Sequence, residues 1–241
     1  MLGLPAQITV ALFDLDGVLT TTATVHSEAW RRAFDAFLVA RAADGGGPGE
    51  DLRPFADRDY LDHVDGRPRL DGVRGFLASR SIVVDDAAVE AIAEAKNTEF
   101  LATLARDGVT AYPGSVRYLN AAREAGLRIA VVTSSKNGAA VLEAAGLTSF
   151  VEHRVDGNTI VEEQLRGKPA PDSYLRGAEL MGVAPAEAAV FEDAISGVQA
   201  GAAGHFGYVI GIDRVGGPQA ENMATAGADV VVTDLDALLS H

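Results

Sequence analysis

The feature that most constrains this chain is an apolar run at residues 8–12 that ends at a pair of acids. An unbroken run of β-branched and large apolar residues is typical of a strand buried on both faces of a parallel sheet. Asp14, Asp16 and Gly17 follow it directly. In open α/β sheets the ligand crevice lies at the carboxyl ends of the strands. Two carboxylates there would stabilise a core poorly, but they suit a metal and phosphate site.

Length and composition set the broad class. The 241 residues suffice for one large domain or two small ones, and 48% hydrophobic with 22% charged residues is typical of a soluble globular protein. No apolar run approaches the roughly 20 residues needed to cross a bilayer. The first residues lack the pattern of a signal peptide, so we expect a cytoplasmic protein. The absence of cysteine excludes disulfides, thiolate metal sites and a cysteine nucleophile.

The charge balance bears on partners. With 20 basic and 34 acidic side chains, the formal net charge of -14 argues against nucleic acid and anionic membranes, which need a positive footprint. A phosphate-bearing substrate would be repelled by this field. A local cluster of Mg²⁺, lysine and arginine would therefore have to reverse the sign at the site.

Residues 25–106 have the patterns of helices. An amphipathic helix is expected over 25–38, and further helical patterns cover 60–63, 73–77 and 86–106. The Gly-rich stretch 44–51 is expected to be a mobile loop. Only residues 82–84 have the pattern of a strand, and they are few. This stretch is therefore expected to be an all-helical insertion.

Strands and helices alternate after residue 109. Strands are expected at 127–132, 188–191, 208–212 and 229–232, with helices over 138–145, 170–181 and 196–203 between them. This alternation predicts an α/β fold with a doubly wound parallel sheet. We expect a core formed by residues 1–22 and 108–241 and a helical cap formed by 23–107. The loop at 156–165 has no assigned role.

Polar side chains follow four expected strand ends: Asp14 and Asp16; Thr133, Ser134 and Ser135; Lys168; and Glu192 with Asp193. A carboxylate can accept a phosphoryl group, and Mg²⁺ held by neighbouring carboxylates would offset the charge that repels it. A hydroxyl, backbone N–H groups and a lysine can hold the oxygens of the transferring group. Each motif alone has a plainer explanation as a turn, a helix cap or a loop. Their common placement favours one site.

With these motifs the chain resembles the haloacid dehalogenase superfamily. Asp14 to Val18 match its first motif, Thr133 the second, Lys168 the third, and Glu192 with Asp193 the fourth. The resemblance implies Asp14 as nucleophile and Asp16 as general acid and base. It further implies one Mg²⁺ held by Asp14, the Asp16 main-chain carbonyl and Asp193, with Glu192 close by.

Among superfamily members with helical caps, the chain looks most like the β-phosphoglucomutase family. That family's pattern is matched by Thr22, His26 and Trp30; by Ser134, Ser135, Lys136 and Asn137; by Gly66 and Arg69; and by Lys96 with Asn97. The resemblance assigns Arg69 and Lys96 to the distal phosphate or sugar and His26 to positioning Asp16. The chain departs from the pattern at Asp65, Gly72, Thr133 and Ala194. These departures bear on the substrate more than on the phosphoryl chemistry.

The resemblance implies interconversion of β-D-glucose 1-phosphate and glucose 6-phosphate, with glucose 1,6-bisphosphate as intermediate and primer. A phosphatase acting on sugar phosphates or other small phosphomonoesters would use the same core residues. A non-catalytic phosphoacceptor of the receiver type is a third possibility, but such a module is shorter and uncapped. Gly201 to Gly204 lack the spacing of a dinucleotide-binding loop. We expect a monomer whose partner is a small sugar phosphate, with neither nucleic acid nor membrane involved.

Overall fold

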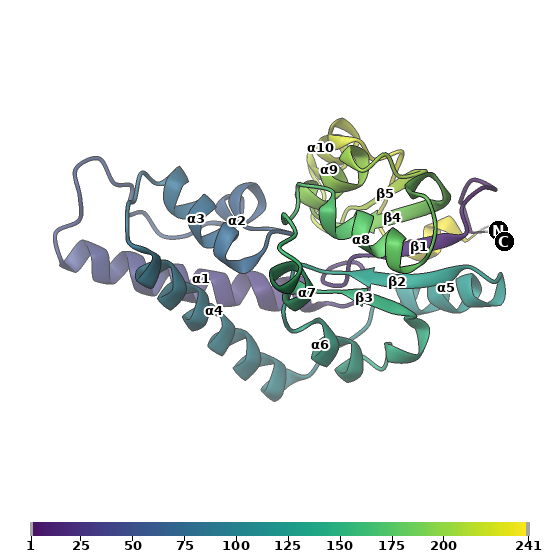
Figure 1. Ribbon diagram of the computed structural model, residues 1–241. Coiled ribbons are helices and arrows are strands. Elements are labelled where there is room, and N and C mark those ends of the chain that lie inside the picture. The colour runs from purple at the N-terminus through teal and green to yellow at the C-terminus, as the bar shows by residue number, and fades with distance from the viewer. Residues whose placement is uncertain (1, 240–241) are drawn as a thin grey trace. The chain divides into compact units, whose positions relative to one another are not determined.

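The computed structural model describes residues 2–239, which divide into two compact units (Figure 1). The first unit contains the residues up to Thr21 and those from Val109 onward, and the second is Thr22–Gly108. The boundaries expected from the sequence, after residues 22 and 107, each lie one residue from this division. The first unit is called the core below, and the second the cap.

The core contains one six-stranded sheet in which every neighbouring pair of strands is parallel. The strand order is β3-β2-β1-β4-β5-β6, so the first strand of the chain lies at the centre. The strands are β1 (Val10–Phe13), β2 (Arg128–Val132), β3 (His153–Val155), β4 (Ala188–Glu192), β5 (Tyr208–Ile212) and β6 (Val230–Val232). The doubly wound parallel sheet predicted from the sequence is confirmed.

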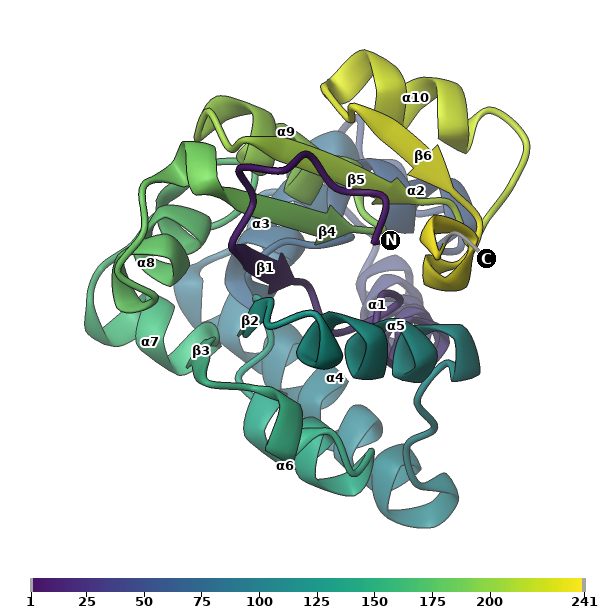
Figure 2. The same cartoon turned by 90° about the vertical axis from the view of Figure 1, so that its right-hand side faces the viewer.

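Helices cover both faces of this sheet, as right-handed crossovers require (Figure 2). The elements α5 (Pro113–Glu124), α6 (Gly138–Ala144) and η3 (Leu235–Leu238) lie on one face. The other face carries α8 (Asp172–Leu180), α9 (Ile195–Ala203) and α10 (Gln219–Ala226). The remaining short elements of the core are α7 (Gly157–Glu162), η1 (Thr148–Phe150) and η2 (Pro185–Glu187).

Alternate residues of the central strands supply the two layers of the hydrophobic core. Leu12 and Val190 belong to the cluster that contains Tyr174 and Met223. Phe13 points to the opposite face, where it stacks on Phe191 with ring centroids 4.2 Å apart. Because all four residues of β1 are fully buried, the strand is apolar throughout and does not alternate. This burial places the end of β1 at a fixed point of the sheet.

The two chain crossings between core and cap are tied together within the core. The Thr21 N–H donates to the Thr110 carbonyl at 2.9 Å, and the Tyr112 N–H donates to the Leu19 carbonyl at 3.0 Å. Thr20 and Ala111 form an antiparallel bridge between these bonds. The insertion therefore leaves and re-enters the core at one place.

Three expectations from the sequence are wrong. Residues 82–84 form no strand, and the Ile82 N–H instead donates to the Leu77 carbonyl at 2.9 Å, closing the end of a helix. The chain has a strand at β3 and a helix at α7 that were not expected. Two of the three residues of β3, His153 and Arg154, are exposed, so the strand lacks an apolar run. Lys168 follows no strand but lies in the loop between α7 and α8.

The cap is all-helical, with α1 (Thr22–Ala43), α2 (Asp57–His63), α3 (Arg69–Ser79) and α4 (Asp86–Asp107). Its hydrophobic core contains Trp30, Phe34, Phe55 and Phe76, whose rings are stacked, tilted or edge-on to one another at centroid distances from 4.1 to 5.1 Å. The side chain of Asp85 caps α4 by accepting from the Ala88 N–H at 2.9 Å. The cap thus has a hydrophobic core of its own.

The Gly-rich stretch 44–51 has no helix or strand but is anchored at its end. Arg41 donates two hydrogen bonds to Glu50, at 3.0 and 2.6 Å, and the Gly47 N–H donates to the same carboxylate at 2.8 Å. This carboxylate closes the loop against the end of α1. The hydrogen bond from Arg41 is the main cause that lowers the pKa of Glu50.

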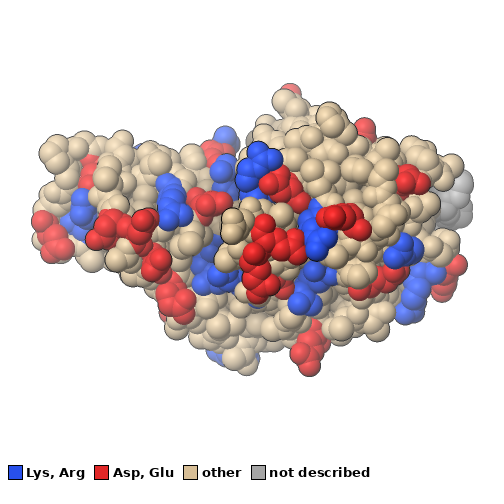
Figure 3. Space-filling model, viewed as in Figure 1, with Lys and Arg blue, Asp and Glu red and all other residues tan. Residues whose placement is uncertain are grey.

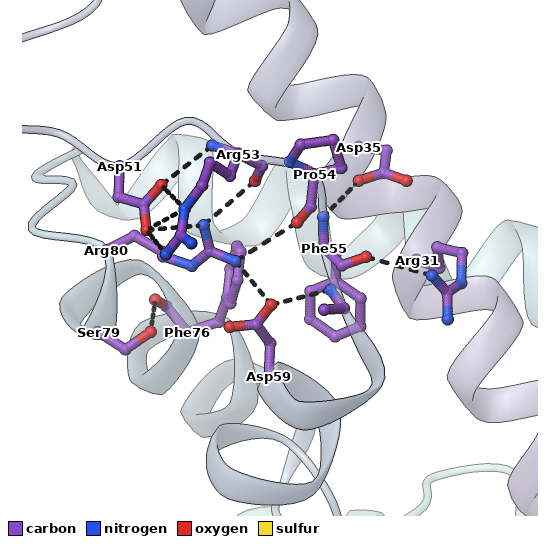
Figure 4. A network of polar contacts seen from close by, with 11 residues as sticks. Arg31, Asp35, Asp51, Arg53, Pro54, Phe55, Asp59, Phe76, Ser79 and Arg80 are labelled. Carbon is purple, nitrogen blue, oxygen red and sulfur yellow. Dashed lines mark hydrogen bonds and ion pairs between the residues drawn. The ribbon is translucent and has the colours of Figure 1, made fainter.

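Arg80 holds the segment that follows this loop (Figure 4). Its guanidinium is buried and forms ion pairs with Asp51 at 3.0 Å and Asp59 at 2.6 Å. It also donates to the Arg53 carbonyl at 3.2 Å and lies 5.2 Å from the centre of the Phe76 ring. One side chain thereby joins the end of α3 to residues 51–59, which have little secondary structure before α2.

On the face shown in Figure 3, acidic and basic side chains are interspersed. No helix among residues 2–239 combines the length and the apolar character needed to span a bilayer. Because the formal net charge is -14, a site for a phosphate group needs positive charge supplied by neighbouring groups.

We predict that Arg80→Met will destabilise the cap by about 3 kcal/mol, because it leaves the partly buried Asp59 without its ion-pair partner, whereas Asp51 keeps Arg53. Chemical denaturation followed by circular dichroism measures the loss. The control is Arg74→Met on the same helix, where the lost partner, Asp86, is 85% exposed and the pair contributes little. Equal unfolding midpoints for the two variants would contradict the assignment of Arg80.

Candidate active site

The loop after β1, residues 14–20, is a tight turn that presents its acids at the carboxyl edge of the sheet. The Leu15 carbonyl accepts hydrogen bonds from the N–H groups of Leu19 and Thr20, both at 3.0 Å. The Thr20 hydroxyl donates to the same carbonyl at 3.1 Å. Asp14 continues the line of the strand, and its N–H donates to the Phe191 carbonyl at 2.9 Å. These hydrogen bonds close the turn, which is called the β1 loop below.

Gly17 is required in the β1 loop for two reasons. Its φ of +90° lies in the left-handed region that favours glycine. A Cβ atom at this position would also lie 1.7 Å from an oxygen of Asp193. The Asp193 carboxylate, which follows β4, therefore packs directly against the Gly17 backbone. This contact brings the first and fourth sequence motifs together.

Lys168 is the positive centre of the site. Its ammonium lies 2.6 Å from Asp14 Oδ1 and 2.6 Å from Glu192 Oε1, and it donates to the Val132 carbonyl at 3.2 Å. The side chain is fully buried. Burial lowers the pKa of Lys168, but the two carboxylates outweigh burial and raise it. The lysine is therefore a permanent cation.

Asp14, directly after β1, is buried. Burial raises the pKa of its carboxyl well above the ordinary value, while the Lys168 ammonium acts in the opposite direction. The carboxylates of Glu192 and Asp16 raise it further. Crowded negative charge of this kind favours the binding of a cation.

Glu192 fixes Lys168 from the other side. Its Oε1 accepts from the Tyr174 hydroxyl at 2.8 Å, and its Oε2 accepts from the Ala194 N–H at 3.2 Å. The Tyr174 ring also lies 4.9 Å from the Lys168 ammonium. Gly197 leaves room for the carboxylate, since a Cβ there would lie 1.7 Å from Oε1. The sequence analysis missed Tyr174 and Gly197, because neither belongs to a cluster of polar residues.

The loop after β2, residues 133–137, carries the hydroxyl expected from the second motif. The buried Thr133 donates from Oγ1 to Asp16 Oδ2 at 3.4 Å and accepts from the Ser135 N–H at 3.1 Å. Ser135 Oγ in turn accepts from the Asn137 N–H at 3.2 Å. Ser134 is half-buried and Lys136 is exposed. The structure thus brings Thr133 and Asp16 together.

The segment with no assigned role supports this second loop. The Gly157 N–H donates to the Ser135 carbonyl at 3.0 Å, and the Asn158 side chain donates to the Lys136 carbonyl at 3.0 Å. Asp156 caps α7 through the N–H groups of residues 158 and 159 and pairs with Arg154 at 2.8 Å. The start of α7 therefore fixes the backbone of residues 133–137.

One group of acids can hold a metal ion. Oxygen atoms of Asp14, Glu192 and Asp193 all lie within 4.8 Å of one another. Carboxylate oxygens are the ligands that Mg²⁺ prefers. The donor set fits a divalent cation of this kind, because its three carboxylates outnumber the single neighbouring ammonium, that of Lys168.

The candidate residues in the cap form a separate cluster. His26 stacks on Phe100 with centroids 4.1 Å apart, and the Lys96 ammonium lies 2.5 Å from His26 Nδ1. Lys96 is buried, 4.9 Å from the Phe100 ring centre and 5.2 Å from that of Trp30. Trp30 itself belongs to the cap core. His26, Trp30 and Lys96 are thus brought together by α1 and α4.

Arg69 begins α3 and has weak partners. It donates to the Ala93 carbonyl at 3.4 Å and lies 3.7 Å from Glu94, whose side chain is 72% exposed. Burial lowers the pKa of Arg69, although Glu94 acts in the opposite direction. Gly66, three residues before it, has a φ of +71°. A guanidinium with long contacts of this kind keeps donors for a further anion.

A central parallel strand that ends in two acids, with a buried lysine and a further acidic pair at the same edge, defines a phosphoryl-transfer class of α/β enzyme. The match to the family model of haloacid dehalogenase-like hydrolases covers residues 8–205. The chain belongs to this family, as the sequence resemblance predicted. Membership implies a divalent metal ion, typically Mg²⁺, which the acidic group at Asp14 fits.

The relatives include both mutases and phosphatases. The chain is 50% identical over 250 aligned positions to β-phosphoglucomutase of Mycobacterium bovis, covering 99% of this chain and 94% of that protein. It is 32% identical to hexitol phosphatase A of Escherichia coli, covering 80% and 77% of the two chains. A crystal structure of β-phosphoglucomutase from Clostridium difficile superposes with a TM-score of 0.76 at 23% identity, over 96% and 93% of the chains, and shows the shared fold.

We predict that Lys168→Met will destabilise the metal-free core by about 4 kcal/mol, because two buried carboxylates lose their counter-ion. The Lys168 ammonium lowers the pKa of Asp14, so its removal raises that pKa further. A carboxyl whose pKa is raised on folding takes up a proton, and its destabilising effect grows with pH. The difference in free energy of unfolding between wild type and Lys168→Met should therefore become smaller as the pH is lowered from about 8 to about 5.

Tyr174→Phe is the matched control for this experiment. It removes one hydrogen bond to Glu192 and leaves the Lys168 ion pairs in place, so a loss of about 1.5 kcal/mol is expected. Denaturant unfolding at several pH values measures both variants. If the loss of unfolding free energy in Lys168→Met did not change with pH, the proposed coupling between Lys168 and Asp14 would be contradicted.

Proposed function

We propose that the chain is a Mg²⁺-dependent β-phosphoglucomutase that transfers phosphoryl groups through Asp14. The observation that carries the proposal is the buried Asp14–Lys168–Glu192 cluster at the carboxyl edge of the sheet. It occurs in a chain that is 50% identical over nearly its full length to a β-phosphoglucomutase. The phosphoryl chemistry rests on the core residues, and the choice of sugar phosphate rests on that relative.

Asp14 is the proposed nucleophile and carries the phosphoryl group between turnovers. Asp14, Asp193 and the Asp16 main-chain carbonyl would hold the metal, while the oxygens of Glu192 already bind Lys168, Tyr174 and the Ala194 N–H. The bound Mg²⁺ would offset the negative charge that the phosphoryl group brings to these acids. Lys168 and Thr133 would hold the oxygens of the transferring group.

Asp16 is the proposed general acid and base. In the first half-reaction it takes the proton from the sugar 6-hydroxyl as that oxygen attacks the phosphoryl group on Asp14, which gives glucose 1,6-bisphosphate. In the second half-reaction the 1-phosphate passes to Asp14, and Asp16 returns the proton to the departing 1-oxygen. The Thr133 hydroxyl, 3.4 Å from Asp16 Oδ2, helps to orient this carboxylate.

The cap residues are proposed to bind the rest of the substrate. Arg69 and Lys96 are assigned to the phosphate that is not being transferred, since both are cations with arginine suited to bidentate phosphate binding. His26 is assigned to positioning Asp16, and Gly66 and Trp30 to shaping the sugar site. Ser134, Ser135, Lys136 and Asn137 supply further polar groups. A single chain carries every proposed group, so a monomer would suffice for the reaction, and we propose that it acts in the cytoplasm.

A phosphatase is the second candidate, favoured by the relation to hexitol phosphatase A. Water in place of the sugar hydroxyl would release phosphate from Asp14. We predict that purified protein with β-glucose 1-phosphate, Mg²⁺ and a trace of glucose 1,6-bisphosphate forms glucose 6-phosphate faster than it releases phosphate. A coupled dehydrogenase assay and a phosphate assay measure the two rates. Rapid phosphate release without glucose 6-phosphate would replace the mutase with the phosphatase.

Asp16→Ala tests the proton transfer that both candidates share. We predict that kcat falls by about 10³-fold, because general acid–base catalysis of this kind contributes that order of rate. The control is Asp107→Ala, which removes an exposed carboxylate at the end of α4 and should leave kcat unchanged. Undiminished turnover in Asp16→Ala would rule out its role as acid and base.

A further inference from the structure

Arg214 joins three distant segments of the core. It lies just after β5, and its Nε donates to the Gly17 carbonyl of the β1 loop at 3.1 Å. Its Nη1 donates to the Thr233 carbonyl at 2.8 Å and to Asp234 Oδ2 at 2.7 Å. The guanidinium carbon lies 3.9 Å from the centre of the Tyr112 ring. One side chain therefore links the β1 loop, the residues after β6 and the residues before α5.

This arrangement is more than a surface ion pair. The Arg214 side chain is only 16% exposed. Its Nη2 is buried, and among residues 2–239 it has no hydrogen-bond partner. Leaving a buried guanidinium donor unsatisfied costs free energy. The other contacts of Arg214 must offset this cost. Among them, the hydrogen bond to the Gly17 carbonyl is the one that reaches the β1 loop.

Gly17 transmits this contact to two acids. Its N–H donates to the Thr20 carbonyl at 2.8 Å, so the Arg214 bond to its carbonyl completes the restraint of this residue on both sides. Asp16 is the preceding residue in the chain. Asp193 packs on the Gly17 Cα so closely that a Cβ would lie 1.7 Å from its oxygen. A shift of the Gly17 backbone would therefore displace Asp16, Asp193 or both.

The charge of Arg214 is largely used by Asp234. That carboxylate lies 2.7 Å away and also accepts from the Asp236 N–H at 3.2 Å, which holds it in place. With its charge paired, Arg214 acts on the acids through geometry rather than by neutralising them.

We propose that Arg214 is a positioning residue for phosphoryl transfer, which fixes the Gly17 carbonyl and through it the metal-binding acid Asp193 and the acid–base residue Asp16. The proposal rests on the proposed function for the identity of the reaction. Its physical content, the placement of Asp193 for a divalent cation, is independent of which phosphate ester is turned over. Residues that orient the ligands of a metal commonly change its affinity by about 10- to 100-fold when they are replaced.

The test compares Arg214→Met with Arg117→Met. Both variants remove an arginine that pairs with an aspartate of the segment 234–236, but Arg117 is 58% exposed and contacts Asp236 at the surface. Binding of Mn²⁺ to the substrate-free protein is measured by electron paramagnetic resonance, and kcat and KM are measured with β-glucose 1-phosphate. We expect Arg214→Met to bind Mn²⁺ about tenfold more weakly and to lose kcat with little change in KM. Arg117→Met should match wild type.

Arg214→Lys keeps the charge and most of the stem, so it provides a second variant if Arg214→Met does not fold. A single ammonium lacks the planar fork that reaches the Gly17 carbonyl and Asp234 together, so this variant should also bind Mn²⁺ more weakly than wild type. Wild-type Mn²⁺ affinity and kcat in a folded Arg214 variant would overturn the proposal, even if its melting temperature fell.

Failure of the proposed function has a different signature. If wild-type protein turned over neither β-glucose 1-phosphate nor any other sugar phosphate, the reaction would be misassigned. The tenfold loss of Mn²⁺ affinity in Arg214→Met would still support the positioning of Asp193. The two proposals can therefore fail separately.

Discussion

The rest of the site depends on one buried cation. Lys168 lies between Asp14 and Glu192 at 2.6 Å from each, and without it two carboxylates would be buried close together at the end of the central strands. The desolvation of such a cluster is offset only when each charge has partners of good geometry. Tyr174, the Ala194 N–H and the Val132 carbonyl complete those partners. The positions of the acids in the site therefore depend on a buried ion-pair network whose charged groups all have partners.

The sheet and the acids of the site were predictable from the sequence because their signals are local. The apolar strand followed by Asp14 and Asp16 is visible within residues 8–16, and β4 with Glu192 and Asp193 is visible within residues 188–193. Lys168 was wrongly placed at a strand end, since a lysine before a proline gives no information about the element that precedes it. β3 was missed because its exposed residues hide the strand pattern.

The supporting residues could not be found in this way. Tyr174, Asn158 and Arg214 reach the site across 18 to 197 positions of sequence, and each looks like an ordinary helix or loop residue. Their role follows from parallel topology, which brings the ends of β1, β2, β4 and β5 to one edge. In the cap, the pairing of His26 with Lys96 joins α1 to α4 over 70 positions. Such contacts need the three-dimensional arrangement.

The paired crossings at residues 19–21 and 110–112 have a consequence for how such a chain can diversify. Because the Thr21 and Thr110 backbones are hydrogen-bonded to each other, the two ends of the inserted segment are held side by side by residues of the core. The cap, with an aromatic core of its own, can then be lengthened, exchanged or replaced by a short turn without moving the β1 loop. The acids at the carboxyl edge of the sheet can thereby stay in place while the proposed substrate-binding residues of the cap change.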